Sequence, residues 1–149
     1  MQNKSPYEAL YFQRLNALDS ALRNVVLSVQ SEYYTRQSLK LLVHDARLKL
    51  KAMDFWLRYL EPVAYKKLNG PLPVEWETEV FEKFEKLYRW EGAGLTLAEL
   101  YLDKTHFSAD RLQKPIEPSI QILDVYRAVS IDSQLKNPDR FFMPIGYFC

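Results

Sequence analysis

The first part of the chain carries two apolar stripes that recur at helical spacing over several turns. The first stripe comprises Tyr11, Leu15, Leu18, Leu22, Val25 and Val29, and the second comprises Leu39, Val43, Ala46, Leu50, Met53, Leu57 and Leu60. Because the steps alternate between three and four residues, each stripe lies along one narrow helical face. Helices joined by a short connection pack as antiparallel neighbours. The pattern therefore predicts an antiparallel helix pair.

Capping residues and prolines indicate where the helices of this pair begin and end. Ser5, Pro6 and Glu8 combine an N-cap, a first-turn proline and a capping-box glutamate, so we expect the first helix to run from about Pro6 to Tyr34.

The second helix is expected to start after a Thr35 cap and to reach about Leu60. Pro62 interrupts it, because proline lacks a backbone donor and clashes with the preceding turn. A short helix from Pro62 to Leu68 should follow, and we expect Gly70 to end it in a left-handed conformation.

A third long helix is expected from about Glu75 to Trp90. Apolar residues recur there at helical spacing, and three glutamates each precede a cation by four residues. The chain shows no two-residue alternation long enough to predict a sheet.

After a kink bracketed by Gly92 and Gly94, a helix is expected up to Leu102, with inward side chains at Leu95, Ala98 and Leu102. Ser108 is a candidate cap for the next segment.

Two closely spaced prolines, Pro115 and Pro118, predict a break, followed by a helix from Pro118 to about Leu135. A further helix should begin at Asn137 and Pro138. The chain then ends in an apolar tail that comprises Phe141, Phe142, Met143, Ile145, Tyr147 and Phe148.

These segments predict an all-α class and one helical-bundle domain over residues 1–149, with four to five antiparallel helices. Hydrophobic residues make up 48% of the chain and charged residues 26%, which are ordinary globular values. A net charge of +1 argues against a dedicated nucleic-acid binder. We interpret the basic stretch on the second helix (Arg36, Lys40, Arg47, Lys49 and Lys51) as part of a solvated face.

The cysteine count and the hydropathy exclude several kinds of site and a membrane-spanning helix. Cys149 is the single cysteine, which excludes an internal disulfide, a cysteine-pair zinc site and a covalently attached haem. No apolar run reaches the roughly 18 residues of a membrane span. No export leader is visible, and its absence does not decide the compartment.

Candidate chemistry is sparse. Glu99, Asp103 and His106 are spaced by four and three residues, so they share one helical face if the helix extends that far; they are the candidate metal ligands. The alternative is a polar helix end that faces solvent. His44 is interpreted as a surface or boundary residue. The chain has no Glu-x-x-His pair for a di-metal centre and no nucleophile elbow, and we expect a protein without enzymatic activity.

Part of the chain, roughly residues 39–102, resembles a helical region that precedes the haem domains of bacterial di-haem cytochrome c peroxidase-like proteins. That region is similar to the imelysin family, whose members are helical, exported and associated with iron acquisition. The matching segments are Ala46-Arg47-Leu48-Lys49-Leu50-Lys51, the positions Leu57, Tyr59, Leu60, Glu61 and Pro62, the connection Leu68-Asn69-Gly70-Pro71-Leu72-Pro73, and Gly92-Ala93-Gly94-Leu95-Thr96-Leu97-Ala98-Glu99-Leu100.

Imelysins carry a Gly-x-His-x-x-Glu motif at the last of these segments. Here Gly94 and Glu99 match it, while Thr96 takes the place of the histidine. The resemblance implies an imelysin-like bundle, shortened at its C-terminus, located in the periplasm or otherwise exported. Haem would then belong to a partner or to a downstream domain, and this chain would hold no cofactor.

Three functions remain open. The first is an accessory domain that docks onto or positions a haem-containing peroxidase. The second is an imelysin-like protein of iron uptake that binds iron or a small ligand through Glu99 and its neighbours. The third is a helical protein-interaction module with no connection to haem. The apolar tail also predicts a homodimer formed through the C-terminal segment.

Overall fold

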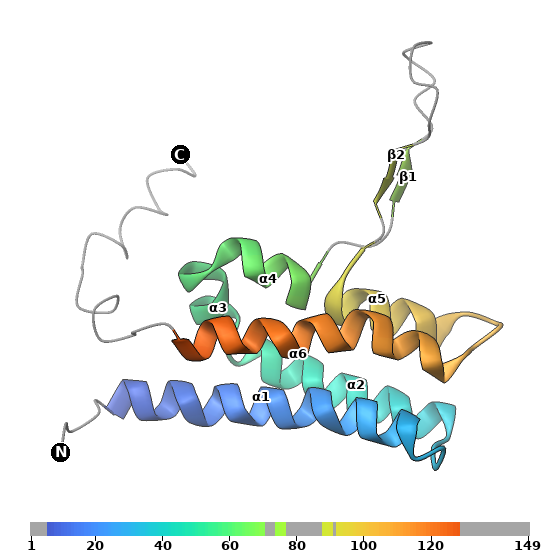
Figure 1. Ribbon diagram of the computed structural model, residues 1–149, viewed down its shortest axis with the longest axis horizontal. Helices are drawn as coiled ribbons and strands as arrows, with labels where there is room; N and C mark the ends of the chain where they lie inside the picture. Colours follow the sequence, from blue (N-terminus) through green and yellow to red (C-terminus); the bar gives the residue numbers. More distant parts are fainter. Residues whose placement is uncertain (1–5, 71–73, 77–87, 91, 129–149) are drawn as a thin grey trace, which may run out of the picture.

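The computed structural model describes residues 6–70, 74–76, 88–90 and 92–128, and these form a mostly helical body (Figure 1). The elements in chain order are α1 (Pro6–Gln30), α2 (Arg36–Lys51), α3 (Asp54–Leu60), α4 (Pro62–Leu68), β1 (Val74–Trp76), β2 (Tyr88–Trp90), α5 (Gly94–Asp103), the 3₁₀ turn η1 (Ala109–Leu112) and α6 (Gln113–Ala128).

The predicted pair of N-terminal helices is confirmed. Every residue of the two apolar stripes is buried, and α1 and α2 pack along each other. α6 covers α1, and α5 packs on both α2 and α6, so these four helices form the bundle (Figure 1). α3 and α4 cover one end of α6. The all-α class is therefore confirmed for the bulk of the described chain, apart from one short ribbon.

The first two helices end earlier than expected. α1 stops at Gln30 rather than near Tyr34, and Glu32 takes a positive φ of 58° in the turn that follows. Thr35 caps α2 as predicted: its side chain accepts a hydrogen bond from the Ser38 backbone nitrogen, and the Ser38 hydroxyl completes the capping box.

The expected continuous helix up to Leu60 is divided into α2 and α3. The division falls at Ala52 and Met53, and Met53 adopts φ −115° and ψ −3°. Both Met53 and Leu57 stay buried, so the core stripe keeps its phase across the irregularity. Pro62 starts α4 as predicted.

The prediction of a helix from Glu75 to Trp90 was wrong at both ends of that segment. Residues 74–76 and 88–90 are antiparallel strands, with Val74 paired to Trp90 and Trp76 paired to Tyr88. Valine and aromatic residues favour strands, and this local preference prevails over the helical spacing that the sequence suggested. Most of the interior of that expected helix lies outside the described residues. The ribbon projects away from the bundle (Figure 1).

The helix α5 agrees closely with the prediction. Leu95, Ala98 and Leu102 are buried, and both Gly92 and Gly94 take positive φ values, 71° and 63°. Gly70 does not, so the expectation of a left-handed glycine after α4 was wrong. Gly70 is needed for space instead, because a Cβ there would lie 2.7 Å from the Ala93 Cβ.

The break expected near the two prolines was also wrong, because α6 contains both. Pro115 lies in the first turn, where helical nitrogens need no partner, while Pro118 lies inside the helix. The buried hydroxyl of Ser119 lies 2.9 Å from the Pro115 carbonyl and 3.1 Å from the Lys67 carbonyl of α4. The single Ser119 proton is shared between these two carbonyls, and packing on α1, α4 and α5 holds this helix in place despite Pro118. Ser108 precedes η1, but its side chain makes no capping hydrogen bond.

Predictions beyond Ala128 lie outside the described residues. These are the helix continuation to Leu135, the helix at Asn137 and Pro138, and the apolar tail. Among the described helices, none is both long enough and apolar enough to cross a membrane.

Two buried tyrosines connect the ends of the described chain. The Tyr11 hydroxyl on α1 donates to the Tyr126 carbonyl at 3.1 Å. The Tyr126 hydroxyl in turn lies 3.1 Å from the Leu57 carbonyl and 2.9 Å from the Glu61 carbonyl. Burial raises the pKa of both phenols above the ordinary value of 10.0. These hydrogen bonds satisfy polar groups inside an otherwise apolar core.

Candidate functional site

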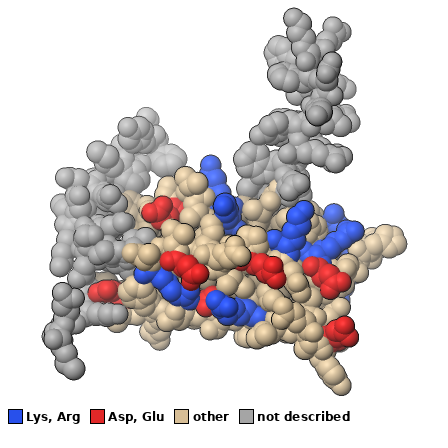
Figure 2. All heavy atoms as spheres, viewed as in Figure 1, with Lys and Arg blue, Asp and Glu red and all other residues tan. Residues whose placement is uncertain are grey.

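Three cations on α2 face α5 and hold it. Arg36, Lys40 and Arg47 are spaced by four and seven residues, so they lie on the same side of α2. The interpretation of the basic stretch as solvated was wrong for Arg47, whose side chain is only 14% exposed. Arg36 is exposed and Lys40 is partly exposed, and their charged groups also contact α5 or the turn that follows it. Elsewhere the charges are mixed: on the face seen in Figure 2, basic and acidic side chains are interspersed.

Arg47 makes the central contact between α2 and α5. Its Nε lies 2.9 Å from Glu99 Oε1 and its Nη2 lies 2.9 Å from Glu99 Oε2, so the guanidinium binds both carboxylate oxygens. The Arg47 side chain is 14% exposed, against 41% for Glu99. A two-point contact of this kind is stronger and more directional than a single charge pair.

The hydrogen bonds continue from Arg47 into the end of α4. Arg47 Nη1 donates to Asn69 Oδ1, and the Thr96 hydroxyl donates to the same oxygen at 3.2 Å. The Asn69 amide nitrogen donates to the Tyr65 hydroxyl at 2.9 Å, and that hydroxyl donates to Asp54 Oδ1. We call Arg47, Asn69, Thr96 and Glu99 the polar joint. It connects α2, the end of α4 and the start of α5.

The backbone at the polar joint permits this approach only because glycine is present. Asn69 and Gly94 form an isolated antiparallel bridge. A Cβ on Gly94 would overlap the Leu68 carbonyl group, and the residue has a φ of 63°. A side chain at this position is therefore excluded both by space and by backbone conformation.

The other end of α5 is held by Arg36 and Lys40. Arg36 Nε donates to the Leu102 carbonyl at 2.7 Å, and Nη2 donates to the Lys104 carbonyl at 2.6 Å. Arg36 thus binds backbone oxygens at and just beyond the C-terminal end of α5, where a positive charge is favoured. Lys40 Nζ lies 2.8 Å from Asp103 Oδ1. The hydrogen bond from Lys40 lowers the pKa of the Asp103 carboxyl, and the Lys40 charge lowers it further.

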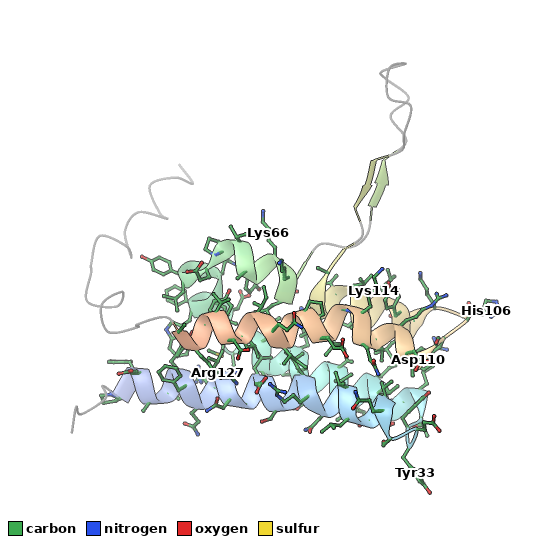
Figure 3. The ribbon with its side chains drawn as sticks, in the orientation of Figure 1. Tyr33, Lys66, His106, Asp110, Lys114 and Arg127 are labelled. Carbon is green, nitrogen blue, oxygen red and sulfur yellow. The ribbon has the colours of Figure 1, made fainter. Side chains whose placement is uncertain are left out.

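The three residues predicted as metal ligands are not gathered at one point. Glu99 is bound by Arg47, and Asp103 is bound by Lys40. α5 ends at Asp103, and His106 lies in the turn beyond it, where it points away from the bundle (Figure 3). Within the described ranges, no three side chains of His, Cys, Asp or Glu are grouped closely enough to hold a metal ion.

A shallow, open depression lies beside these residues, between α2 and α5. It has a volume of about 290 Å³, and its polar lining consists of Lys40, His44, Glu99 and Asp103. His44 is exposed, as the sequence suggested. Two of the three predicted ligands therefore face a common depression, although each carboxylate is already matched by a cation.

Sequence reasoning missed Arg47 and Asn69 as parts of this cluster. Arg47 lies one position beyond the buried Ala46, so it falls at the boundary of the core stripe, where a long side chain reaches a neighbouring helix. Asn69 was interpreted only as a helix-ending residue. For the other half of the polar joint, the signal in the sequence was the segment from Gly94 to Glu99, which resembles the imelysin motif except that Thr96 stands at the histidine position.

Comparisons with protein families, with curated proteins and with solved structures find no match to this chain. The geometry itself defines a helical bundle whose candidate site is a charged, hydrogen-bonded joint between three helical segments.

Proposed function

We propose that this chain is a non-enzymatic helical docking module that positions a haem-containing peroxidase. The resemblance to the region ahead of di-haem peroxidase domains motivates the identity of the partner, and an exported location belongs to the same proposal. The segment that carries this resemblance, residues 39–102, includes all four residues of the polar joint.

The observation that carries the proposal is the projecting ribbon formed by β1 and β2. Its two ends leave and re-enter the bundle at the polar joint, where Asn69 and Gly94 pair. An isolated two-stranded ribbon is marginally stable in water, and an open strand edge offers backbone groups that another chain can pair with. A ribbon whose two ends are fixed to the bundle at the Asn69–Gly94 bridge is suited to bind a partner.

The proposed function also accounts for the charge state of the joint. The Glu99 carboxylate matches the glutamate of the imelysin motif, but the Arg47 guanidinium supplies its counter-charge from within the chain. A carboxylate that accepts two hydrogen bonds from arginine holds α5 against α2, and this is a positioning task.

The test is a titration of the purified chain against the purified di-haem peroxidase of the same organism, followed by calorimetry. The matched variant replaces the chain between Gly70 and Ala93 with a short Gly-Ser linker, which the Asn69–Gly94 pairing allows. We expect the wild type to bind and the linker variant to lose binding while its helical circular dichroism is retained. The control is Tyr33→Ala, at a side chain that is 95% exposed at another point of the surface (Figure 3).

Absence of binding by the wild type would overturn the haem connection. Equal binding by the linker variant would show that the ribbon is not the docking element. Binding of a protein that lacks haem, with no binding of the peroxidase, would favour the general interaction module instead.

A second candidate, binding of iron or a small ligand for iron uptake, is favoured by the depression lined by His44, Glu99 and Asp103. Its test is elemental analysis after incubation with ferrous or ferric iron. Wild-type chain is compared with the double variant Glu99→Ala, His44→Ala, which removes two side chains that line the depression, and with the control Asp45→Ala. Bound iron that is lost only in the double variant would support this function, and negligible iron in all three proteins would exclude it.

A further inference from the structure

The pairing that forms the ribbon begins within the bundle, before β1. The antiparallel bridge between Asn69 and Gly94 lies five residues before β1 and four residues after β2, so it nearly continues their pairing toward the helices. Gly70 and Ala93, the next residues outward, are also close, because a Cβ on Gly70 would lie 2.7 Å from the Ala93 Cβ. We call Asn69, Gly70, Ala93 and Gly94 the ribbon base. The two segments that carry the ribbon therefore lie side by side where they leave the bundle (Figure 1).

The Arg47 side chain holds both of these segments. Its Nη1 donates to Asn69 Oδ1, on the segment that enters the ribbon. On the segment that returns from the ribbon, Nη2 lies 3.3 Å from Thr96 Oγ1, and Nε and Nη2 bind the Glu99 carboxylate. The Thr96 hydroxyl also donates to Asn69 Oδ1. Arg47 thus connects the ribbon base to α2, which packs along α1 and α5.

A guanidinium is suited to fix an orientation, because it is planar and points several donors in set directions. The Arg47 side chain is 14% exposed, so packing as well as hydrogen bonds sets its position. Without these side-chain contacts the backbone bridge of the ribbon base can persist, but no hydrogen bond from α2 sets the angle of the ribbon base against the helices. The direction of the ribbon then depends on the backbone alone.

We propose that Arg47 is a positioning residue for docking, and that it fixes the direction in which the ribbon leaves the bundle. The inference rests on the proposed function, in which the ribbon is the part that contacts the partner. A recognition element that is held in one orientation binds more tightly than one that must be ordered on binding. Arg47 therefore raises the affinity without touching the partner.

The direct test measures the direction of the ribbon in the full chain without a partner. Spin labels are attached at Glu75→Cys on β1 and at Leu27→Cys on α1, where the native leucine is 60% exposed. Cys149→Ser removes the single native cysteine. Pulsed electron paramagnetic resonance then gives the distribution of distances between the two labels. We expect one narrow distribution when the polar joint is intact.

Asn69→Ala is the decisive variant, because it removes the oxygen on which Arg47 and Thr96 converge. The pair of Arg47 with Glu99, which joins α2 to α5, stays intact. We expect the single narrow distribution to be lost while the helical circular dichroism is retained. Arg47→Met should have the same effect.

The matched control breaks a contact between helices at a distance from the ribbon base. Arg127→Met removes the ion pair of α6 with Asp19 on α1, in which the nitrogen–oxygen distance is 2.9 Å (Figure 3). We expect this variant to keep the narrow distribution. A role of Arg47 in stability alone predicts a narrow distribution in every variant that folds.

Binding of the di-haem peroxidase to the unlabelled variants is measured by calorimetry. Asn69→Ala should bind about tenfold more weakly than the wild type, since the ribbon must then be ordered at the moment of binding. Arg127→Met should bind like the wild type.

The inference is overturned if the distribution is already broad with the polar joint intact, if Asn69→Ala keeps it narrow, or if Arg127→Met broadens it equally. It is also overturned if Asn69→Ala broadens the distribution but binds the peroxidase like the wild type. A wild type that does not bind the peroxidase overturns the docking role, while the label distances still decide whether Arg47 orients the ribbon. Should Arg47→Met not fold, Asn69→Ala decides alone.

Discussion

The guanidinium of Arg47 on α2 binds both carboxylate oxygens of Glu99 on α5, with each nitrogen–oxygen distance 2.9 Å. The same guanidinium donates to Asn69 at the end of α4, so one side chain ties three segments of the bundle. Because the carboxylate is 41% exposed, the pair combines a mostly buried cation with a partly solvated anion. Removal of Glu99 would therefore leave a mostly buried cation without its counter-charge, whereas removal of Arg47 leaves a carboxylate that water can reach.

Replacing Arg47 with Met should lower the free energy of unfolding by about 2 kcal/mol. The variant leaves Asn69 and Glu99 without their donor, and unmade hydrogen bonds at partly buried sites cost about 1–3 kcal/mol. Urea unfolding followed by circular dichroism measures the change. The control is Lys49→Met, which removes an exposed intrahelical pair and should change stability by less than about 0.5 kcal/mol. Equal effects of the two variants would contradict the special role of Arg47.

Replacing Gly94 with Ala should destabilise the bundle by at least about 2 kcal/mol. The added Cβ overlaps the Leu68 carbonyl, and the positive φ adds about 1 kcal/mol or more of backbone strain. Gly94→Asn separates the two costs, because asparagine tolerates the left-handed region but still brings a Cβ. We expect both variants to be destabilised in thermal unfolding, Asn somewhat less. A Gly94→Asn variant as stable as the wild type would contradict this, because it would show that the backbones at Leu68 and Gly94 can move apart to admit a Cβ.

The Asp103 carboxyl should titrate below its ordinary pKa of 3.8 and should return toward that value in Lys40→Met. Its pKa is lowered in the folded protein, so its contribution to stability is present above the unfolded pKa. That contribution is lost as the pH falls through the lower folded pKa. Carboxyl-carbon NMR over an acid titration reads this pKa directly. A wild-type value equal to that of Lys40→Met would contradict the contact.

Replacing Tyr126 with Phe should cost about 1 kcal/mol, because the Leu57 and Glu61 carbonyls lose the phenol hydrogen bond and keep only their backbone donors. The raised phenol pKa also predicts a pH effect. Its stabilising contribution is complete below the unfolded value near 10.0 and is lost as the pH rises toward the higher folded value. Tyrosinate absorbance in an alkaline titration should show delayed ionisation. The control is Tyr33→Phe, at a tyrosine that is exposed, and it should leave the delayed part of the titration unchanged.

Periodic burial is the part of this fold that the sequence predicts well. Leu15, Leu22, Leu39 and Leu50 are all essentially inaccessible, as their spacing implied, and Thr35 caps the helix that it was expected to cap. These features are local, because a helical face and a cap are defined within a few residues. The all-α class follows from them.

The remaining features depend on contacts between distant segments. Pro118 is tolerated because α6 packs against three helices, and the residues from Val74 to Trp76 pair with a strand that lies beyond a long intervening stretch. The polar joint is of the same kind: Arg47 meets Glu99 across 52 positions of the chain. A single sequence gives the charge of such residues but not which opposite charge each of them will meet.

The covering of α1 by α6 has a consequence for the order in which the protein can mature during synthesis. Tyr11 is synthesised before Tyr126, yet the buried Tyr11 hydroxyl has its hydrogen-bond acceptor in the Tyr126 carbonyl. A nascent chain that ends before α6 would leave uncovered the part of α1 on which α6 packs, and exposed apolar surface invites chaperone binding or aggregation. The packing on α1 is therefore completed only once α6 has left the ribosome, rather than helix by helix.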